Sequence, residues 1–369
     1  MLTDQDAVPT TEDALDVVVI GGGQAGLAVG FYLRRTGLRY VILDEQATPG
    51  GAWQRTWPSL RLFSPAQWSS LPGWMMPRDA SASAGEYPTR DATIAYLTEY
   101  ERRYALPIDR PVRVHGVRET HEGLELETTR GAMRARAVVS ATGSWANPYL
   151  PNLPGHETYR GVVVHSAFYP GAEPFVGRRV VVVGGGNSGA QIAAELMDVA
   201  DVTWATREPP TFLPEHVDGH YLFAQATERY KALQEGRTPE PARSLGDIVR
   251  VPPVQAALAR GALVAVPMFE RLTPDGVRWA DGREDRVDAV ILATGFRPAV
   301  AHLASLGVVG SDGRVAMRTP RATRVAAPAP LWLVGYGDWT GFASATLVGV
   351  GRSARATVDE IVRELADRG

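Results

Sequence analysis

Two glycine-rich segments repeat one pattern, and each could hold the phosphates of a dinucleotide. Residues 16–33 read DVVVIGGGQAGLAVGFYL and residues 179–196 read RVVVVGGGNSGAQIAAEL, so in both an apolar run leads through GxGxxG into a small-residue helix. The first glycine allows a tight turn, the second lets the backbone approach a pyrophosphate, and the third lets helix and strand pack closely. Unpaired N–H groups at each helix N-terminus favour an anion. The predicted contacts are Gly21, Gly23, Gln24, Ala25, Gly26, Gly184, Gly186, Asn187, Ser188 and Gly189.

The residue after the second strand of each unit distinguishes the two ligands. Counting 23 positions from the first glycine gives Asp44 (21 + 23) in one copy and Arg207 (184 + 23) in the other. A carboxylate accepts hydrogen bonds from ribose hydroxyls, whereas a guanidinium pairs with a 2′-phosphate. We therefore expect FAD at the first site, bound by Asp44 and Glu45, and NADPH at the second, bound by Thr206 and Arg207. Glu208 would repel a 2′-phosphate or pair with Arg207, so NADH is expected to be tolerated.

A stretch rich in Gly, Pro and Trp follows the first unit. It contains Trp53, Trp57, Trp68 and Trp74, either buried for packing or lying over a large flat ligand. We favour the second interpretation, because an isoalloxazine ring needs apolar walls with few polar contacts. Gly51 suits a close backbone approach to the pyrophosphate or the ribityl chain.

The elements expected around these motifs belong to an α/β fold. Strands are expected at 17–20, 41–44, 111–115, 124–128, 135–140, 180–183, 287–292 and 331–334, and helices at 24–35, 89–104 and from about 344. The runs 135–140 and 287–292 both end in Ala-Thr-Gly, where we expect the chain to cross between domains, with Thr294 as a further cofactor contact.

This pattern predicts two Rossmann-like domains, with the NAD(P)H domain inserted into the FAD domain. The FAD domain is expected at 1–149 and 291–369 and the NAD(P)H domain at 150–290. A polar, mostly helical insertion at about 209–253 is either a surface feature or a lid over the nicotinamide.

Asp338 lies in a Gly-rich turn before the last helix. Its carboxylate can accept hydrogen bonds from ribityl hydroxyls, while the helix N-terminus points toward the pyrimidine edge of a flavin. An Asx turn is the alternative, and we favour the flavin contact.

Composition excludes several classes of function. The chain has no cysteine among its 369 residues, so it cannot pass electrons to a cysteine pair of its own. A net charge of −3 without basic runs argues against nucleic-acid and anionic membrane partners. No apolar stretch long enough for a membrane span and no signal peptide are evident, so we expect a cytoplasmic protein. The histidines lack metal-ligand spacing, and we predict no metal.

The segment TYRGVVVHSAFYP resembles the FxGxxxHxxx(Y/F) signature of flavin-containing monooxygenases, with Tyr159 in place of the leading Phe. GGGQAG, GGAW, GGGNSG and both Ala-Thr-Gly endings extend the resemblance over nearly the whole chain. It is closest to the short bacterial members, including those encoded near arsenic-resistance genes. His165 is interpreted as an interdomain hydrogen-bonding residue.

The resemblance implies that NADPH reduces FAD, that O2 adds at flavin C4a, and that the peroxyflavin oxygenates a soft nucleophile such as a sulfide, or attacks a ketone. Tyr169-Pro170 ends the signature where Baeyer–Villiger enzymes have Trp followed by Pro or Asp, which favours heteroatom oxidation. Larger members place an Asn near the flavin, whereas this chain has Leu62-Phe63-Ser64-Pro65 there. Ser64 is the candidate catalytic hydrogen-bond donor.

Two other functions fit the same nucleotide sites. One is an NAD(P)H:quinone or metal-ion reductase, and the other is a flavin redox sensor. The substrate is expected to be a small molecule with O2 as co-substrate, and the sequence leaves its identity and the assembly state, a homodimer included, open.

Overall fold

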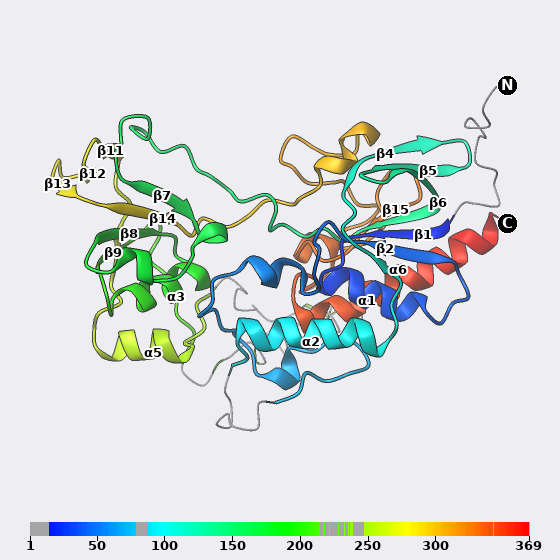
Figure 1. Ribbon diagram of the computed structural model, residues 1–369, viewed down its shortest axis with the longest axis horizontal. Coiled ribbons are helices and arrows are strands. Elements are labelled where there is room, and N and C mark those ends of the chain that lie inside the picture. The colour runs from blue at the N-terminus through cyan, green and yellow to red at the C-terminus, as the bar shows by residue number, and fades with distance from the viewer. Residues whose placement is uncertain are drawn as a thin grey trace, which may run out of the picture.

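The computed structural model contains two β-sheet units joined by two chain crossings (Figure 1). The described residues are 15–78, 87–214, 247–341 and 343–368, together with 217, 221, 228, 232, 235, 237 and 238. Most of the predicted insertion at 209–253 therefore lies outside the described residues.

The first sheet combines a parallel part with an antiparallel edge. Its strands are β1 (Leu15–Ile20), β2 (Tyr40–Leu43), β3 (Ile108–Asp109), β4 (Val114–Thr120), β5 (Gly123–Thr128), β6 (Gly131–Ser140) and β15 (Leu331–Leu333). They follow the order β3-β2-β1-β6-β5-β4, and β15 also pairs with β6. β3, β2, β1, β6 and β15 run parallel, whereas β5 is antiparallel to both β6 and β4. The carboxyl ends of β1, β2 and β6 thus meet at one edge, where ligands bind such sheets.

The second sheet is parallel throughout. Its strands are β7 (Val162–His165), β8 (Arg179–Val183), β9 (Asp201–Thr206), β10 (Ala265–Pro267) and β14 (Ala289–Leu292), in the order β10-β9-β8-β14-β7. A small antiparallel sheet of β11 (Arg271–Thr273), β12 (Gly276–Arg278) and β13 (Glu284–Arg286) lies beside it. All these strands fall between β6 and β15 in the chain, so the second unit is inserted into the first.

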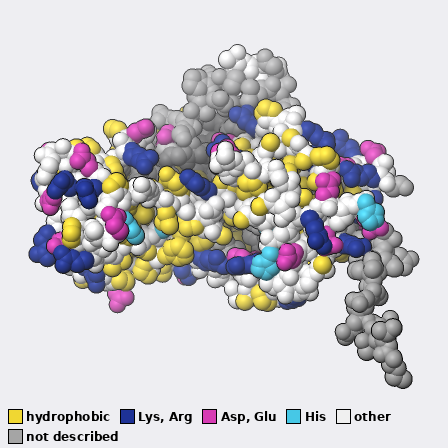
Figure 2. All heavy atoms as spheres, turned by 90° about the horizontal axis from the view of Figure 1, so that it is seen from above, with side chains coloured by type: hydrophobic (Ala, Val, Ile, Leu, Met, Phe, Trp, Pro, Cys, Tyr) yellow, Lys and Arg dark blue, Asp and Glu magenta, His cyan; other side chains and the backbone are white. Residues whose placement is uncertain are grey.

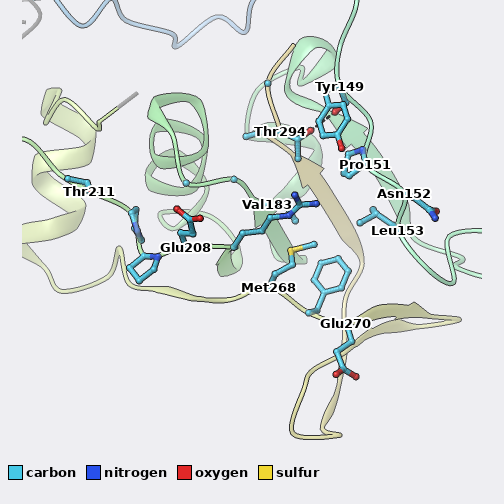
Figure 3. Close-up of a pocket in the computed structure, with 18 of the residues that line it drawn as sticks. Tyr149, Pro151, Asn152, Leu153, Val183, Glu208, Thr211, Met268, Glu270 and Thr294 are labelled. Carbon is cyan, nitrogen blue, oxygen red and sulfur yellow. Dashed lines mark hydrogen bonds between the residues drawn. The ribbon is translucent and has the colours of Figure 1, made fainter. Parts of the chain in front are cut away.

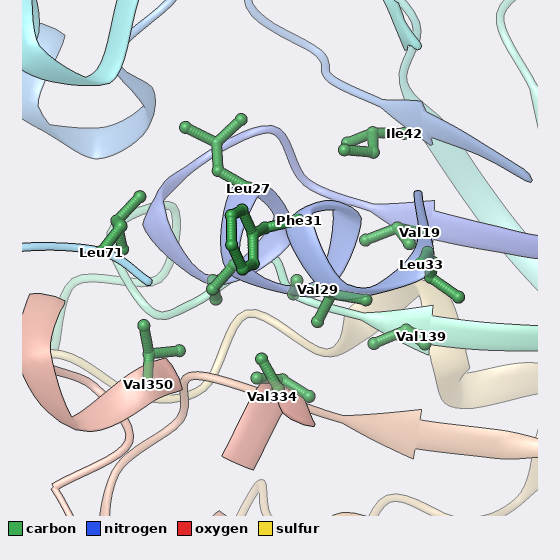
Figure 4. Packing of buried hydrophobic residues seen from close by; sticks show 14 of the residues in the cluster. Val19, Leu27, Val29, Phe31, Leu33, Ile42, Leu71, Val139, Val334 and Val350 are labelled. Atoms are coloured by element: carbon green, nitrogen blue, oxygen red, sulfur yellow. The ribbon is translucent and has the colours of Figure 1, made fainter. Parts of the chain in front are cut away.

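The helices pack against the sheets through their apolar residues. They are α1 (Gln24–Leu33), α2 (Arg90–Arg103), α3 (Asn187–Leu196), α5 (Pro252–Ala259) and α6 (Leu347–Asp367). α1 is buried along most of its length, because it packs between the first sheet, α6 and α2. Figure 4 shows Leu27 and Phe31 of α1 among side chains of β1, β6 and α6. α2 and α6 begin at the capping residues Thr89 and Thr346, whose side chains accept backbone N–H groups of their own first turns.

The α/β fold predicted from the repeat is confirmed, since both βαβ units are present around the two glycine motifs. One strand prediction was wrong: 111–115 is strand only at its end, where β4 begins, because Val112 instead donates its N–H to the carbonyl of Asp44. The domain limits at 149/150 and 290/291 stay a prediction.

Acidic and basic side chains are interspersed over the face in Figure 2, in keeping with a net charge of −3. None of the helices in the described parts of the chain has the length and apolarity of a membrane span.

Candidate active site

The two glycine motifs have the same geometry. Gly21 and Gly184 have φ angles of +108° and +134°, which favour glycine. A Cβ on Gly26 would lie 1.9 Å from the carbonyl oxygen of Gly21, and one on Gly189 would lie 2.1 Å from that of Gly184. These glycines therefore let each helix pack directly on its strand.

The middle glycines leave the space that a pyrophosphate requires. A Cβ on Gly23 would meet only the Cα of Gly51, at 3.8 Å, and one on Gly186 would meet nothing within 4 Å. Both glycines are the N-cap residues of their helices, so no capping side chain occupies the space beside the first turn. Gly51 belongs to this cradle, because its own Cβ would lie 2.7 Å from the Cα of Gly23. Both cradles fit a dinucleotide.

Asp44 lies next to the first cradle, just after β2. It is buried, and its Oδ2 is 2.9 Å from the Nε of Arg110, whose other guanidinium nitrogens bind Glu101 at 2.9 and 3.0 Å. Its Oδ1 accepts the backbone N–H of Gln46 at 3.3 Å. Glu45, by contrast, is partly exposed and pairs with Arg113 at 3.0 Å. Arg110 belongs to no sequence motif, because nothing in the spacing relates it to a residue 66 positions earlier.

A cavity of about 450 Å³ brings together residues from distant parts of the chain. Gln24 and Trp53 hydrogen-bond each other at 3.2 Å, and Gln24 also donates to the carbonyl of Ala345 at 2.7 Å, before α6. The cavity is lined by Gln24, Trp53, Leu62, Phe63, Ser64, Trp68, Ser69, Gly337, Asp338, Ala345, Thr346 and Leu347. Its mainly apolar walls beside the first cradle suit an isoalloxazine ring, and we call it the flavin cavity.

Two of the four tryptophans expected over the flavin lie elsewhere. Trp53 and Trp68 line the flavin cavity, but Trp57 is buried in the apolar cluster of the second sheet. Trp74 packs against Tyr96, with ring centroids 5.1 Å apart and the ring planes tilted by 31°, outside the cavity lining. The expectation was wrong for Trp57 and Trp74, because composition does not show which apolar cluster each indole joins.

Ser64 lies in the cavity wall and is part of a serine pair. The Oγ atoms of Ser64 and Ser69 are 2.8 Å apart, and the Ser69 hydroxyl is also 3.0 Å from the carbonyl of Ser64. Ser69 has one proton, so when it donates to that carbonyl, Ser64 must donate to Ser69. Rotation of both hydroxyls frees the Ser64 proton for the cavity.

Asp338 lies at the cavity rim as an exposed side chain. Its Oδ1 accepts the backbone N–H of Ala343, five residues later, at 3.2 Å, whereas an Asx turn would bond the backbone two residues on. The carboxylate still has further lone pairs for a ligand.

A second cavity, of about 810 Å³, opens beside the second glycine motif (Figure 3). Gly184, Arg207, Glu208 and Thr294 line it, whereas Thr206 is buried with its methyl beneath Gly185. The Thr294 hydroxyl donates to the carbonyl of Tyr149 at 2.6 Å. Leu153, Met268 and Phe269 form an apolar wall of this cavity that no sequence motif indicated.

Asn187 and Ser188 begin α3 at the second motif. The Asn187 side chain donates to the carbonyl of Asp247 at 3.1 Å and accepts the N–H of Val249 at 2.9 Å. It thereby ties the end of the predicted insertion to the second cradle.

The two crossings between the units pair with each other. Ala299 donates its N–H to Gly143 at 2.8 Å, and Tyr149 donates to Gly295 at 2.9 Å. His165 joins this junction, because its Nδ1 accepts the N–H of Ala167 and its Nε2 must then donate to the carbonyl of Gly295, both at 3.0 Å. Burial lowers the pKa of His165, so this neutral form is favoured. The hydrogen-bonding role expected for His165 is confirmed.

A buried chain of hydrogen bonds supports the first crossing. Thr142 donates to the carbonyl of Ala299 at 2.7 Å, so Tyr336 must donate to Thr142, Ser140 to Tyr336, and the Nε2 of His302 to Ser140, over 2.6, 2.6 and 3.0 Å. Burial lowers the pKa of His302 to about 4, which keeps it neutral.

His216 and His220 lie outside the described residues. Within the parts of the chain that the structure describes, no three His, Cys, Asp or Glu side chains form a group that could hold a metal ion.

Comparison with known proteins agrees with this geometry. Residues 18–236 match the family model of the pyridine nucleotide-disulphide oxidoreductases. The chain is similar to an uncharacterized CzcO-like oxidoreductase of Geobacillus kaustophilus, with 30% identity over 76% of this chain and 80% of the relative. It is also similar to the indole-3-pyruvate monooxygenase YUCCA4 of Oryza sativa, with 28% identity over 99% and 91%. The solved flavin-containing monooxygenase of Stenotrophomonas maltophilia shares 50% identity over 96% of this chain and 99% of that chain, with a TM-score of 0.86.

Proposed function

The chain belongs to the pyridine nucleotide-disulphide oxidoreductase family and is an NAD(P)H-dependent flavoprotein monooxygenase, and we propose that it holds FAD in the first unit, prefers NADPH in the second, and oxygenates a sulfide or another soft nucleophile. The observation that carries this proposal is the flavin cavity directly beside the first glycine cradle, with a second cradle and its own cavity in the inserted unit. FAD, when bound, accepts hydride from the nicotinamide and activates O2.

The residues of the first unit have separate tasks in this proposal. Gly23 and the N-terminus of α1 bind the pyrophosphate. Asp44, held by Arg110, accepts hydrogen bonds from the ribose hydroxyls. Asp338 binds the ribityl chain. Trp53, Phe63 and Trp68 exclude water from the ring, while Ser64 offers a hydrogen bond to oxygen at the flavin.

The chemistry of the flavin cavity also favours a neutral substrate. Its polar side chains are neutral apart from the exposed Asp338 at the rim, so it has no buried charge to bind an ionic substrate. A neutral sulfide satisfies these walls, whereas a strongly charged substrate would lose its hydration without a partner. A ketone would also fit, and the end of the signature at Tyr169-Pro170 favours the sulfide.

Product analysis tests this assignment. Purified protein loaded with FAD is supplied with NADPH, O2 and a panel of sulfides, ketones, amines and organoarsenicals, and the products are identified by mass spectrometry. Sulfoxide formation as the fastest reaction supports the proposal. Rapid quinone reduction without any oxygenated product would instead support the reductase alternative, and failure of NADPH to bleach the flavin would support a redox sensor.

A further inference from the structure

Residues 57–63, which we call the arm, follow the first nucleotide unit in sequence but pack into the second. Trp57 is 3% exposed and belongs to the apolar cluster around α3 and β8. Its ring centroid is 6.2 Å from that of Tyr169, which in turn stacks on Phe175 at 5.8 Å. Leu60 and Phe63 are partly buried against the same cluster. Figure 1 shows this segment, in blue, reaching toward α3.

One face of α3 holds the arm with polar groups. Gln191 and Glu195 are four residues apart and so share that face. The Gln191 amide exchanges two hydrogen bonds with the backbone of Arg61, both at 3.4 Å. The Glu195 carboxylate accepts from Ser59 and from the hydroxyl of Tyr169, the latter at 3.3 Å.

The other edge of the arm is fixed to the first unit. Leu62 donates its N–H to the carbonyl of Pro88 at 2.9 Å, and Arg90 donates to the carbonyl of Leu60 at 3.0 Å. Arg90 is the first residue of α2. The arm is therefore bound on one side to α3 and on the other to the start of α2.

The arm ends in the flavin cavity. Leu62 and Phe63 line this cavity together with the next residue, Ser64. α3, for its part, begins at Asn187 in the second cradle. A single helix thus contacts the expected NADP(H) pyrophosphate at its first turn and the arm about one turn later.

We infer that the arm transmits occupancy of the second nucleotide site to the wall of the flavin cavity, with Gln191, Glu195 and Tyr169 as positioning residues. The inference rests on the proposed cofactor sites but not on the substrate. Packed helices shift as units rather than deform, so a displacement of α3 on nucleotide binding moves Phe63 and Ser64 with it. With NADP+ bound, the arm holds these side chains against the flavin and excludes water.

Hydrogen–deuterium exchange on the FAD-loaded protein tests this coupling without turnover. Saturating NADP+ is expected to slow amide exchange in residues 57–69 as well as around the second cradle. Protection of the second cradle alone in the wild-type protein would overturn the inference. The result does not depend on whether the protein oxygenates any substrate, so it separates this inference from the proposed function.

Variants at the contact between the arm and the second unit locate the coupling. Tyr169→Phe removes one hydroxyl from Glu195, and Gln191→Leu removes both hydrogen bonds to Arg61. In each variant, NADP+ is expected no longer to protect the arm from exchange. The amount of H2O2 released per NADPH oxidised is expected to be about threefold higher than in the wild type, in line with losing one or two hydrogen bonds. The KM for NADPH is expected to change little.

Two controls distinguish positioning from a general loss of stability. Tyr159→Phe removes a similar half-buried hydroxyl in the same unit, which donates to Val287 at 3.0 Å and not to the arm. Glu195→Gln keeps a hydrogen-bond acceptor for Tyr169, and both controls should retain wild-type coupling. Equal effects of Tyr159→Phe and Tyr169→Phe on arm protection and H2O2 release would contradict the inference, whatever their melting temperatures.

Discussion

Asp44 and Arg207 occupy equivalent positions in the two units, but their surroundings differ in burial and in charge pairing. Asp44 is buried and already paired with Arg110, so its position is fixed before any ligand arrives. Arg207 is exposed and lines the second cavity together with Glu208. The proposed ribose contact of Asp44 is therefore preorganised, whereas the proposed selectivity for a 2′-phosphate depends on whether Arg207 pairs with the phosphate or with Glu208.

Replacing Arg207 tests the choice of nicotinamide cofactor. Arg207→Gln is expected to lower kcat/KM for NADPH by roughly tenfold or more, the effect of losing one charged hydrogen bond, and to leave NADH unchanged. Glu208→Thr should change the ratio in the opposite direction, because it removes a negative charge near the phosphate. Steady-state kinetics with both cofactors measure the ratio. A wild-type preference for NADH of about tenfold would show that the Arg207 assignment is wrong.

The serine pair predicts opposite behaviour of two adjacent variants. Ser64→Ala removes a hydroxyl from the wall of the flavin cavity and is expected to lower the product formed per NADPH oxidised by up to about tenfold, as for one lost hydrogen bond. Ser69→Ala leaves the Ser64 proton without its protein acceptor, so it should donate into the cavity and preserve coupling. Product and H2O2 yields at equal FAD content measure both. Equal uncoupling in the two variants would exclude Ser64 as the donor.

His302 predicts a stability change with pH. Its pKa is lowered from 6.5 to about 4 by burial, so below pH 6.5 the unfolded chain binds a proton that the native protein does not. The free energy of unfolding should therefore fall with decreasing pH between these values, by up to about 1.4 kcal/mol per pH unit from this group, and be unaffected by it at higher pH. His302→Gln keeps a donor for Ser140 without titrating. Urea unfolding of both proteins across this range measures the difference, and identical slopes would rule out His302 as the source.

At the scale of elements, the glycines of each βα turn have different roles: the last one allows the helix to pack on the strand, and the middle one leaves space for a ligand. Gly189→Ala forces a methyl group to within 2.1 Å of the carbonyl of Gly184, so α3 must move and stability should fall. Gly186→Ala meets no protein atom within 4 Å and has an ordinary φ of −103°, so the fold should be unaffected while the methyl obstructs the pyrophosphate.

Melting temperature and NADP+ affinity together test this contrast. Gly186→Ala should keep the wild-type melting temperature and bind NADP+ at least about tenfold more weakly. Gly189→Ala should lose both. Unchanged NADP+ affinity in Gly186→Ala would place the pyrophosphate elsewhere.

Features that depend on local spacing were predictable, and features that depend on distant packing were not. The glycine motifs, their strands and the Ala-Thr-Gly endings repeat a short pattern, and both βαβ units form around them. Trp57 and Trp53 lie in the same loop, yet one joins the second core and the other the flavin cavity. Arg110, Gln191 and Glu195 received no assignment either, because their partners are 66, 130 and 26 residues away.

At the scale of the molecule, the inserted unit places one nucleotide cradle in each of two sheets. Paired crossings at Gly143–Ala299 and Tyr149–Gly295, together with the arm, join the two units at separate points. With no cysteine in the chain, electrons from NADPH have no thiol acceptor within it and must leave the flavin for an external molecule. We propose that this acceptor is O2, with one oxygen atom transferred to the substrate.

Isotope labelling shows whether an oxygen atom of O2 enters the product. The FAD-loaded protein oxidises NADPH under ¹⁸O2 in ordinary water with the sulfide that reacts best, and the product is analysed by mass spectrometry. We expect one ¹⁸O atom in each sulfoxide and one sulfoxide for each NADPH oxidised in the coupled enzyme. NADPH oxidation that yields only H2O2, or that proceeds equally well with a quinone under anaerobic conditions while the sulfide gains no label, would contradict it.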